Sequence, residues 1–170
     1  MEFDANRRSL LLTSFLAAMP FASSDASASP INPAQTIIKL PADLQWKKSN
    51  PNYPDGSADA CLLAGDINQP GLYFTLIRWW PGYMSAPHTY TTDRLCMVMS
   101  GTWWCNSGPD FDPASCVPVP AGSHVRRVAG TPHYDGVIRG HREPAVIAIC
   151  GLGPVNYALV DPSKPGWRAV

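Results

Sequence analysis

The stretch PHTYTTDRLCMVMSGTWW, residues 87–104, carries the pattern that decides the fold. Its second half is dense in apolar and aromatic residues and is interrupted once, by Ser100-Gly101. That composition is typical of β-structure, and the Ser-Gly pair indicates a turn between two strands or a bend within one. Its first half places a histidine and a tyrosine, His88 and Tyr90, just ahead of this β-run. The stretch therefore predicts a β-sheet with candidate functional side chains at the start of a strand.

The same β-pattern continues on both sides of this stretch. Segments of β-branched and aromatic residues, separated by proline and glycine turns, occupy residues 36–40, 60–66, 72–80, 94–105, 116–140 and 145–160. No segment beyond residue 29 repeats apolar residues with the 3.6-residue period of an amphipathic helix. Roughly ten short strands without helices predict an all-β sandwich or barrel. A jelly roll is favoured over an immunoglobulin-like sandwich, because the Cys…Trp…Cys spacing of the latter is not evident.

Length and composition limit the classes of protein. The 170 residues are 45% hydrophobic and 15% charged, and the formal net charge is zero. This fits a single globular domain whose core is large enough to fold alone. The positive charges are scattered, so no nucleic-acid surface is expected. There is no G-x-S-x-G elbow, P-loop or G-x-G-x-x-G fingerprint after a strand, which argues against the corresponding hydrolase and nucleotide-binding classes.

The N-terminus has the layout of an export signal. Paired arginines, Arg7 and Arg8, precede an apolar run over residues 10–21, and small residues follow up to residue 29. Residues 1–28 are predicted to be a signal peptide of the twin-arginine type, with Ala26-Ser27-Ala28 as the cleavage box. The apolar run is shorter than the roughly 20 residues needed to span a bilayer, so no stable membrane insertion is expected after cleavage. The mature protein is then periplasmic or secreted.

Export would place the five cysteines in an oxidising compartment, where disulfides can form. Cys105 and Cys116 flank a turn-rich loop, and a bridge between them is the pairing that we expect. The other three cysteines lie in apolar, strand-like contexts that suit small buried side chains. No C-x-x-C occurs, so neither a zinc knuckle nor a thioredoxin-type motif is indicated.

Two sequence motifs resemble those of the cupin superfamily. The family's first motif is a glycine, then His-x-His, a glutamate and a second glycine, and its second motif is Pro-x-Gly followed by a histidine. Here Gly82, His88 and Gly101 align with the first motif, and Pro120-Ala121-Gly122 and His133 align with the second. The runs VMSGTWW and PAGSHVRRVAGTPHYDG are similar to those of small single-domain cupins. The resemblance covers residues 72–156 and implies an all-β fold, the cupin-type double-stranded β-helix or jelly-roll barrel.

The export signal, the resemblance and the composition of the two ends together divide the chain into four parts. We expect a signal peptide over residues 1–28, an N-terminal extension with one short strand over residues 29–58, and the cupin barrel over residues 59–160. Residues 161–170 are expected to form a tail without regular structure.

The resemblance implies a metal site, but the motif is incomplete. Cupins typically bind a divalent metal with three histidines and one carboxylate. His88 and His133 match two of these ligands, Tyr90 stands at a third, and Arg94 stands where many members have glutamate. We therefore expect a divalent transition metal (Fe, Mn, Cu, Ni or Zn) bound by His88, His133 and Tyr90. The alternative for His88 is a former ligand that now only forms hydrogen bonds inside the cavity.

Strand alternation predicts where the side chains near His88 point. Alternate residues of a strand share a face, so His88, Tyr90 and Arg94 should point inward and Asp93 outward. An inward Arg94 would repel a cation and attract a carboxylate or phosphate group of a small ligand. Tyr90 and Arg94 are therefore the candidate catalytic residues. The alternatives are that Tyr90 only lines the cavity wall and that Asp93 and Arg94 form a surface ion pair.

The remaining histidines and the tryptophan doublets are assigned mainly structural roles. His124 is expected on an edge strand and His141 in a solvated turn. Adjacent strand residues face opposite ways, so each doublet, Trp79-Trp80 and Trp103-Trp104, should place one ring inside and one outside. Exposed outer rings would suit a homodimer formed by sheet contact.

Three functions follow from these residues. The first is a metal-dependent cupin enzyme that acts on a small organic molecule as an oxygenase, isomerase or lyase. The second is a metal-free cupin that binds a small ligand without catalysis. The third is a structural protein whose interior is filled by side chains and therefore holds no cavity of useful size.

Overall fold

The computed structural model describes residues 34 and 36–170. The predicted signal peptide, residues 1–28, lies outside the described residues. Within the described part of the chain, no helix has both the length and the apolar character required to cross a bilayer. Contacts between Cα atoms divide the chain into residues 1–39 and residues 40–170, and the second unit holds both sheets.

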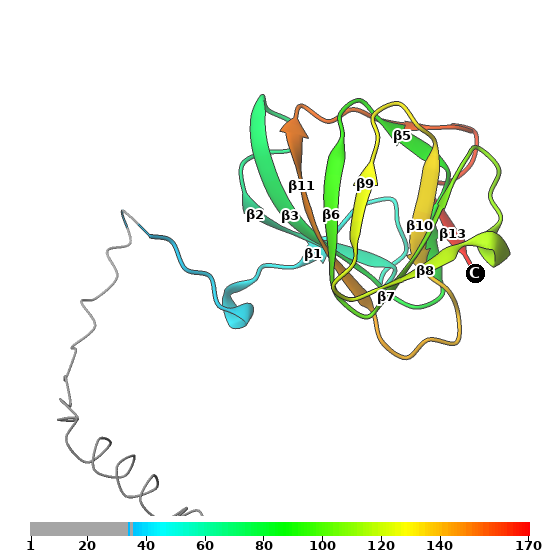
Figure 1. The fold of residues 1–170 in the computed structure, drawn as a ribbon, viewed down its shortest axis with the longest axis horizontal. Helices are drawn as coiled ribbons and strands as arrows, with labels where there is room; N and C mark the ends of the chain where they lie inside the picture. Colours follow the sequence, from blue (N-terminus) through cyan, green and yellow to red (C-terminus); the bar gives the residue numbers. More distant parts are fainter. Residues whose placement is uncertain (1–33, 35) are drawn as a thin grey trace, which may run out of the picture. The chain divides into compact units, whose positions relative to one another are not determined.

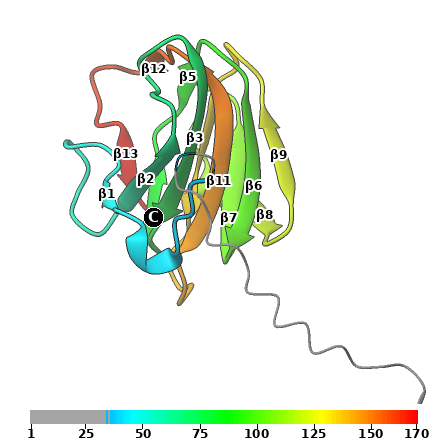
Figure 2. The same cartoon turned by 90° about the vertical axis from the view of Figure 1, so that its left-hand side faces the viewer.

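The strands form two sheets that face each other (Figures 1 and 2). The six-stranded sheet has the order β1 (Lys47–Lys48), β2 (Ala58–Ala64), β3 (Gly71–Trp79), β11 (Ala145–Gly153), β6 (Arg94–Ser100) and β9 (His124–Arg127). The second sheet has the order β12 (Tyr157–Leu159), β5 (His88–Tyr90), β10 (His133–Val137), β4 (Tyr83–Ser85) and β13 (Trp167–Ala169), and β7 (Thr102–Ser107) links β10 to β8 (Val117–Pro120). Helical structure in residues 40–170 is limited to two single turns, η1 (Pro41–Asp43) and η2 (Pro113–Ser115).

The antiparallel pairs bring distant parts of the chain together. The longest runs between β3 and β11, where nine consecutive residue pairs extend from Trp79–Ala145 to Gly71–Gly153. Strand β11 pairs with β6 on its other side, so the C-terminal part of the chain is the centre of the six-stranded sheet. The pairing of β11 with β3 and β6 thus joins strands that lie far apart in the sequence.

The turn predicted at Ser100-Gly101 separates β6 from β7. Gly101 has φ 69°, and an added Cβ would lie 2.3 Å from the carbonyl oxygen of Pro144. Only glycine meets both demands without strain. The sharp break in the first stretch of sequence therefore corresponds to two strands that belong to different sheets.

The tryptophan doublets divide between the two faces of their strands, as predicted. Trp79 and Trp103 are buried between the sheets. Their neighbours lie outside but are only half-exposed: Trp80 donates a hydrogen bond from Nε1 to Asp59 at 2.9 Å, and Trp104 packs against a second small cluster. The outer rings are therefore covered within the chain, and the homodimer stays a prediction.

The expected disulfide between Cys105 and Cys116 is absent, and all five cysteines are free thiols. Cys105 lies opposite Val117 on β8 and belongs to the core between the sheets. Cys116 precedes Val117 by one residue and packs with Met84 and Tyr134 in the cluster on the other face. Alternation along the strand therefore directs the two sulfur atoms to opposite sides of the sheet.

Two predictions about the ends of the domain were wrong. Residues 36–40, predicted as a strand, are irregular, and Ile37 and Ile38 are exposed, so the apolar residues that suggested a strand are not buried by one. Residues 161–170, predicted as a tail without regular structure, contain β13. It pairs with β4 through Trp167–Ser85, Arg168–Met84 and Ala169–Tyr83, a long-range contact that no local pattern reveals.

Candidate functional site

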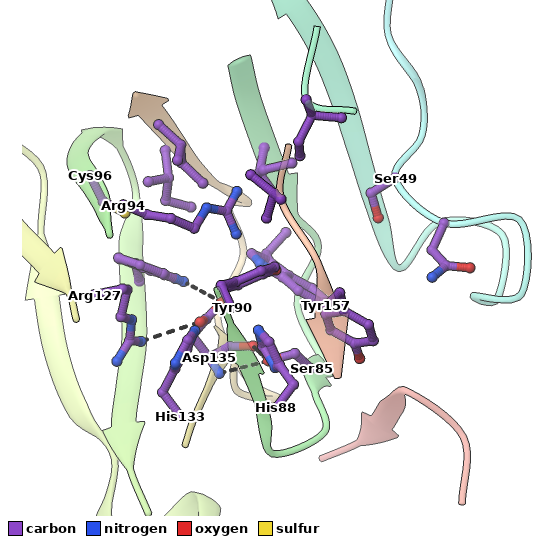
Figure 3. Close-up of a pocket in the computed structure, with 18 of the residues that line it drawn as sticks. Ser49, Ser85, His88, Tyr90, Arg94, Cys96, Arg127, His133, Asp135 and Tyr157 are labelled. Atoms are coloured by element: carbon purple, nitrogen blue, oxygen red, sulfur yellow. Dashed lines mark hydrogen bonds and ion pairs between the residues drawn. The ribbon is translucent and has the colours of Figure 1, made fainter. Parts of the chain in front are cut away.

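A cavity of about 310 Å³ lies between the two sheets. Side chains of both sheets line it, and Figure 3 shows the polar ones converging from opposite walls. Its volume is at the lower end of the range for sites that bind small molecules. The third function expected from the sequence, a structural protein with a filled interior, is therefore not supported.

His88 and His133 meet in this cavity. They are direct cross-strand partners on β5 and β10, and their ring centroids lie 4.4 Å apart. Both side chains are buried, each with 3% of the residue exposed. The pairing of β5 with β10 is what brings together two histidines from separate sequence motifs, and the structure confirms that both point inward (Figure 3).

The hydrogen bonds of the two imidazoles define their protonation. His88 Nδ1 lies 2.8 Å from the carbonyl oxygen of Ala86, and His133 Nδ1 lies 3.0 Å from that of Thr131. A carbonyl oxygen only accepts, so each Nδ1 carries the proton and donates it. In the neutral tautomer each Nε2 then keeps a lone pair. Both histidines thus offer a hydrogen-bond acceptor on the ring edge away from the backbone.

Burial keeps this pair neutral at physiological pH. Loss of solvent, together with the neighbouring imidazole of His133, lowers the pKa of His88 to about 4. Burial likewise lowers the pKa of His133. Two neutral, buried imidazoles are proton acceptors rather than cations.

Two tyrosines complete an aromatic wall around the histidines. The ring of Tyr90 lies 4.9 Å from that of His88 between centroids, and the ring of Tyr157 on β12 lies at the same distance on another side. Burial raises the pKa of Tyr90 and raises that of Tyr157 to about 12. Both phenols are therefore protonated and can donate a hydrogen bond to a bound molecule.

Arg94 is inside the cavity wall and is 7% exposed. Its guanidinium carbon lies 4.2 Å from the centroid of the Tyr90 ring (Figure 3). Asp93 points outward instead, where it accepts hydrogen bonds from Arg126 Nε at 2.8 Å and from the amide of Ala129 at 2.8 Å. The predicted alternation is confirmed, and the alternative of a surface pair between Asp93 and Arg94 was wrong.

A second charged group in the cavity was not predicted from the sequence. Asp135, on β10, accepts hydrogen bonds from Trp103 Nε1 at 3.1 Å and from Arg127 Nη2 at 3.2 Å. The hydroxyl of Ser85 bonds to the backbone of Asp135. Asp135 is two residues after His133, so alternation along β10 could have placed it on the same wall.

The metal site implied by the cupin resemblance is only partly present. His88 and His133 are in place, but Arg94 occupies the carboxylate position and the carboxylate of Asp135 is already held by Arg127 and Trp103. Across residues 34 and 36–170, no three His, Cys, Asp or Glu side chains form a group that could hold a metal ion. Tyr90 would have to lose a proton to become a ligand, and the positive charge of the Arg94 guanidinium beside it opposes a further cation. In the described part of the chain, two of the four ligands of the family's motif, His88 and His133, are therefore in place.

Comparison with known proteins rests on structure. No protein-family model matches the chain, and no curated protein sequence does. Among solved structures, a sugar phosphate isomerase of the cupin superfamily from Silicibacter pomeroyi superimposes with a TM-score of 0.55 at 18% identity, covering 78% of this chain and 92% of the other. The fold is the cupin double-stranded β-helix.

Two further cupin-fold relatives are enzymes by name. The polyketide cyclase RemF from Streptomyces resistomycificus has a TM-score of 0.62 at 14% identity and covers 76% of this chain and 88% of its own. The DMSP lyase DddQ from Ruegeria pomeroyi has a TM-score of 0.57 at 15% identity, covering 73% of this chain and 64% of the lyase. At these identities the likeness concerns the cupin fold alone.

Proposed function

We propose that this cupin binds a small organic molecule in the cavity and acts on it by proton transfer, as an isomerase or a lyase. The observation that carries the proposal is the convergence of His88 and His133 at 4.4 Å, each with Nδ1 bonded to a backbone carbonyl. This arrangement leaves two lone-pair nitrogens available to a ligand. Positioned, neutral imidazoles are the commonest general bases in enzymes.

The surrounding groups suit the same chemistry. The phenols of Tyr90 and Tyr157 are protonated and can donate to a carbonyl oxygen of the ligand. Negative charge that develops when a base removes a proton from carbon would be stabilised by the buried guanidinium of Arg94. In this proposal Tyr90 and Arg94 are the catalytic residues that stabilise the developing oxyanion.

The named proteins of similar fold support the part of the proposal that concerns a small-molecule ligand. An isomerase, a cyclase and a lyase that act on small molecules share this fold. One fold hosts many reactions, so the support for the reaction class is the imidazole pair and not the likeness in fold.

The test uses two carbon acids that are small enough for the cavity, phenylpyruvate and the neutral phenylacetone. Each has an acidic C–H next to its carbonyl group. Each is incubated with the protein in heavy water, and loss of the proton signal next to the carbonyl is followed by NMR. We expect the wild-type protein to accelerate exchange of at least one probe, and His88→Ala combined with His133→Ala to abolish the acceleration. The control is Arg126→Gln, which changes an exposed arginine outside the cavity. Exchange that is equally fast with the double variant would refute the proposal.

Binding of a divalent transition metal by His88, His133 and Tyr90 is the second candidate function. The observation that favours it is the hydrogen bond from each Nδ1 to a carbonyl, which is the usual second contact of a metal-ligating histidine. The protein isolated from its native compartment would then contain a stoichiometric metal by elemental analysis. Metal-free protein that takes up no Zn²⁺, Ni²⁺ or Mn²⁺ at micromolar concentration, while Tyr90→His does, would exclude this candidate and support the first.

A further inference from the structure

We infer that Arg94 makes one end of the cavity a carboxylate-binding subsite, with Tyr73 beside it across Gly151 in the wall behind the cavity, so the ligand is a small organic monocarboxylate. This inference rests on the proposed function, because it assigns the ligand class of the same cavity. It adds two residues, Tyr73 and Gly151, that no sequence motif points to.

The three residues form one row across the inner face of the six-stranded sheet. Tyr73 on β3 is the register partner of Gly151 on β11, and Gly151 is the register partner of Arg94 on β6. Cross-strand partners share a face, so the side chains of Tyr73 and Arg94 approach each other over the glycine. A Cβ added to Gly151 would lie 2.6 Å from the Tyr73 hydroxyl oxygen. The missing side chain is therefore what makes room for that hydroxyl between the two strands.

This row contains two buried polar atoms. The Nε of Arg94 and the hydroxyl of Tyr73 are buried and have no hydrogen-bond partner among the described residues. Tyr73 is 0% exposed and Arg94 is 7% exposed. Buried polar atoms without partners are costly, and the side chain of Arg94 meets that cost at the wall of the cavity that it lines.

The charge of the row is also uncompensated. The cavity's other arginine, Arg127, is paired with Asp135 at 3.2 Å, whereas no ion pair of Arg94 occurs in the described part of the chain. The face of Arg94 that contacts Tyr90 is occupied by the ring, which leaves its edge for a ligand. A guanidinium edge binds a planar carboxylate through two parallel hydrogen bonds. The positive charge of Arg94 would be balanced by one anionic group on the ligand.

The rest of the cavity limits the size and polarity of the remainder of the ligand. Apolar side chains, Ile147, Ile149 and Val155, line the wall together with Trp79, and the imidazole pair lies on the opposite sheet. A carboxylate on Arg94 would leave the remainder of the molecule against these apolar and aromatic walls. The volume of about 310 Å³ limits that remainder to roughly the size of one aromatic ring with a short substituent.

The test compares benzoate with benzamide, which has nearly the same shape but no charge at neutral pH. Binding is measured by calorimetry and by fluorescence of the cavity tryptophans. We expect the wild-type protein to bind benzoate about tenfold or more tightly than benzamide, because hydrogen bonds to charged groups are the stronger class. Arg94→Gln should remove this preference while benzamide still binds. Gly151→Ala should weaken benzoate binding, because the added Cβ would displace the Tyr73 hydroxyl beside Arg94. Tyr73→Phe changes a group outside the cavity lining and should weaken it less than Arg94→Gln does. Arg126→Gln serves as the matched arginine control outside the cavity.

The outcomes separate this inference from the proposed function. Equal affinity for the two probes in the wild-type protein, or a benzoate preference that survives Arg94→Gln, overturns the subsite and leaves cavity binding intact. A benzoate preference that depends on Arg94, without any proton exchange of phenylpyruvate, supports the subsite and counts against the catalytic proposal. Failure of both probes to bind overturns both. Circular dichroism of each variant establishes that it is folded, and Arg94→Lys should restore part of the preference if charge alone contributes.

Discussion

His88 and His133 lie directly opposite each other on β5 and β10, with ring centroids 4.4 Å apart and both Nδ1 atoms bonded to backbone carbonyls. The two residues come from separate sequence motifs and meet only because two strands pair. Their burial side by side has consequences for stability that can be measured without knowledge of the ligand.

The first prediction concerns pH. His88 has a folded-state pKa lowered by burial to about 4, against 6.5 for the free side chain, so the unfolded chain binds more protons between these values. The free energy of unfolding should therefore fall as pH decreases from about 6.5 to about 4, by on the order of 3 kcal/mol. His133, Asp135, Arg94, Tyr90 and Tyr157 face the same site, and the lowered pKa of His133 acts in the same direction. Denaturant unfolding at a series of pH values measures the slope. His88→Gln should flatten it, and an unchanged slope in that variant would show that other groups cause it.

The second prediction is that Arg94→Met stabilises the protein while it abolishes carboxylate binding. Methionine fills much of the same volume and removes an unpaired buried charge, so the free energy of unfolding should rise by about 1–3 kcal/mol. The measurement is denaturant unfolding of both proteins without ligand. A lower stability of the variant would mean that the contact of Arg94 with the Tyr90 ring outweighs the burial of its charge.

The third prediction is that Asp135→Asn destabilises the protein strongly. Arg127 would lose its counter-ion in a site where both side chains are about 10% exposed, and loss of one partner of a buried pair typically costs about 3–5 kcal/mol. A second change, Arg127→Met, should recover much of the loss. Asp161→Asn, at the exposed pair with Lys164, is the control and should have little effect. Equal, small effects at both aspartates would contradict a structural role for Asp135.

The fourth prediction concerns the thiols. All five cysteines are free, and burial raises the pKa of Cys96 and Cys116 to about 11. Thiolates are the reactive form, so Ellman's reagent should react slowly with the native protein and with all five thiols once it is unfolded. Fewer than five reactive thiols in the unfolded, unreduced protein would indicate a disulfide.

The fifth prediction concerns export, for which the sequence is the only support. Mass spectrometry of the protein recovered from the producing cell should show a mature chain that begins near Ser29. Replacement of Arg7 and Arg8 by lysine should retain the protein in the cytoplasm if the twin-arginine route is used. A mature chain that retains residues 1–28 would show that the segment is not a cleaved signal.

Much of the fold was predictable because local patterns carry it. Alternation over residues 72–80 and 94–100 predicted β3 and β6, the Ser100-Gly101 break predicted the end of β6, and the two cupin-like motifs identified the barrel. The inward orientation of His88, Tyr90 and Arg94 followed from the two-residue period of a strand, and the structure has it.

Which strands pair with each other could not be predicted from the sequence. Strand β13 was missed because its three residues are strand only by virtue of β4, and the bridge between Cys105 and Cys116 was expected because spacing along a loop says nothing about which face a side chain occupies. The row of Tyr73, Gly151 and Arg94 depends on the register of three strands.

The sequence by itself determined the all-β class, the inward-facing residues of each strand and the two histidines most suited to chemistry, because these depend on periodicity and residue type. Only the tertiary structure decided that the two imidazoles meet, that Asp135 neutralises Arg127, and that Arg94 has no counter-ion among the described residues. The physical reason is that burial and charge compensation are properties of neighbours in space, and in this barrel those neighbours come from strands distant in the chain.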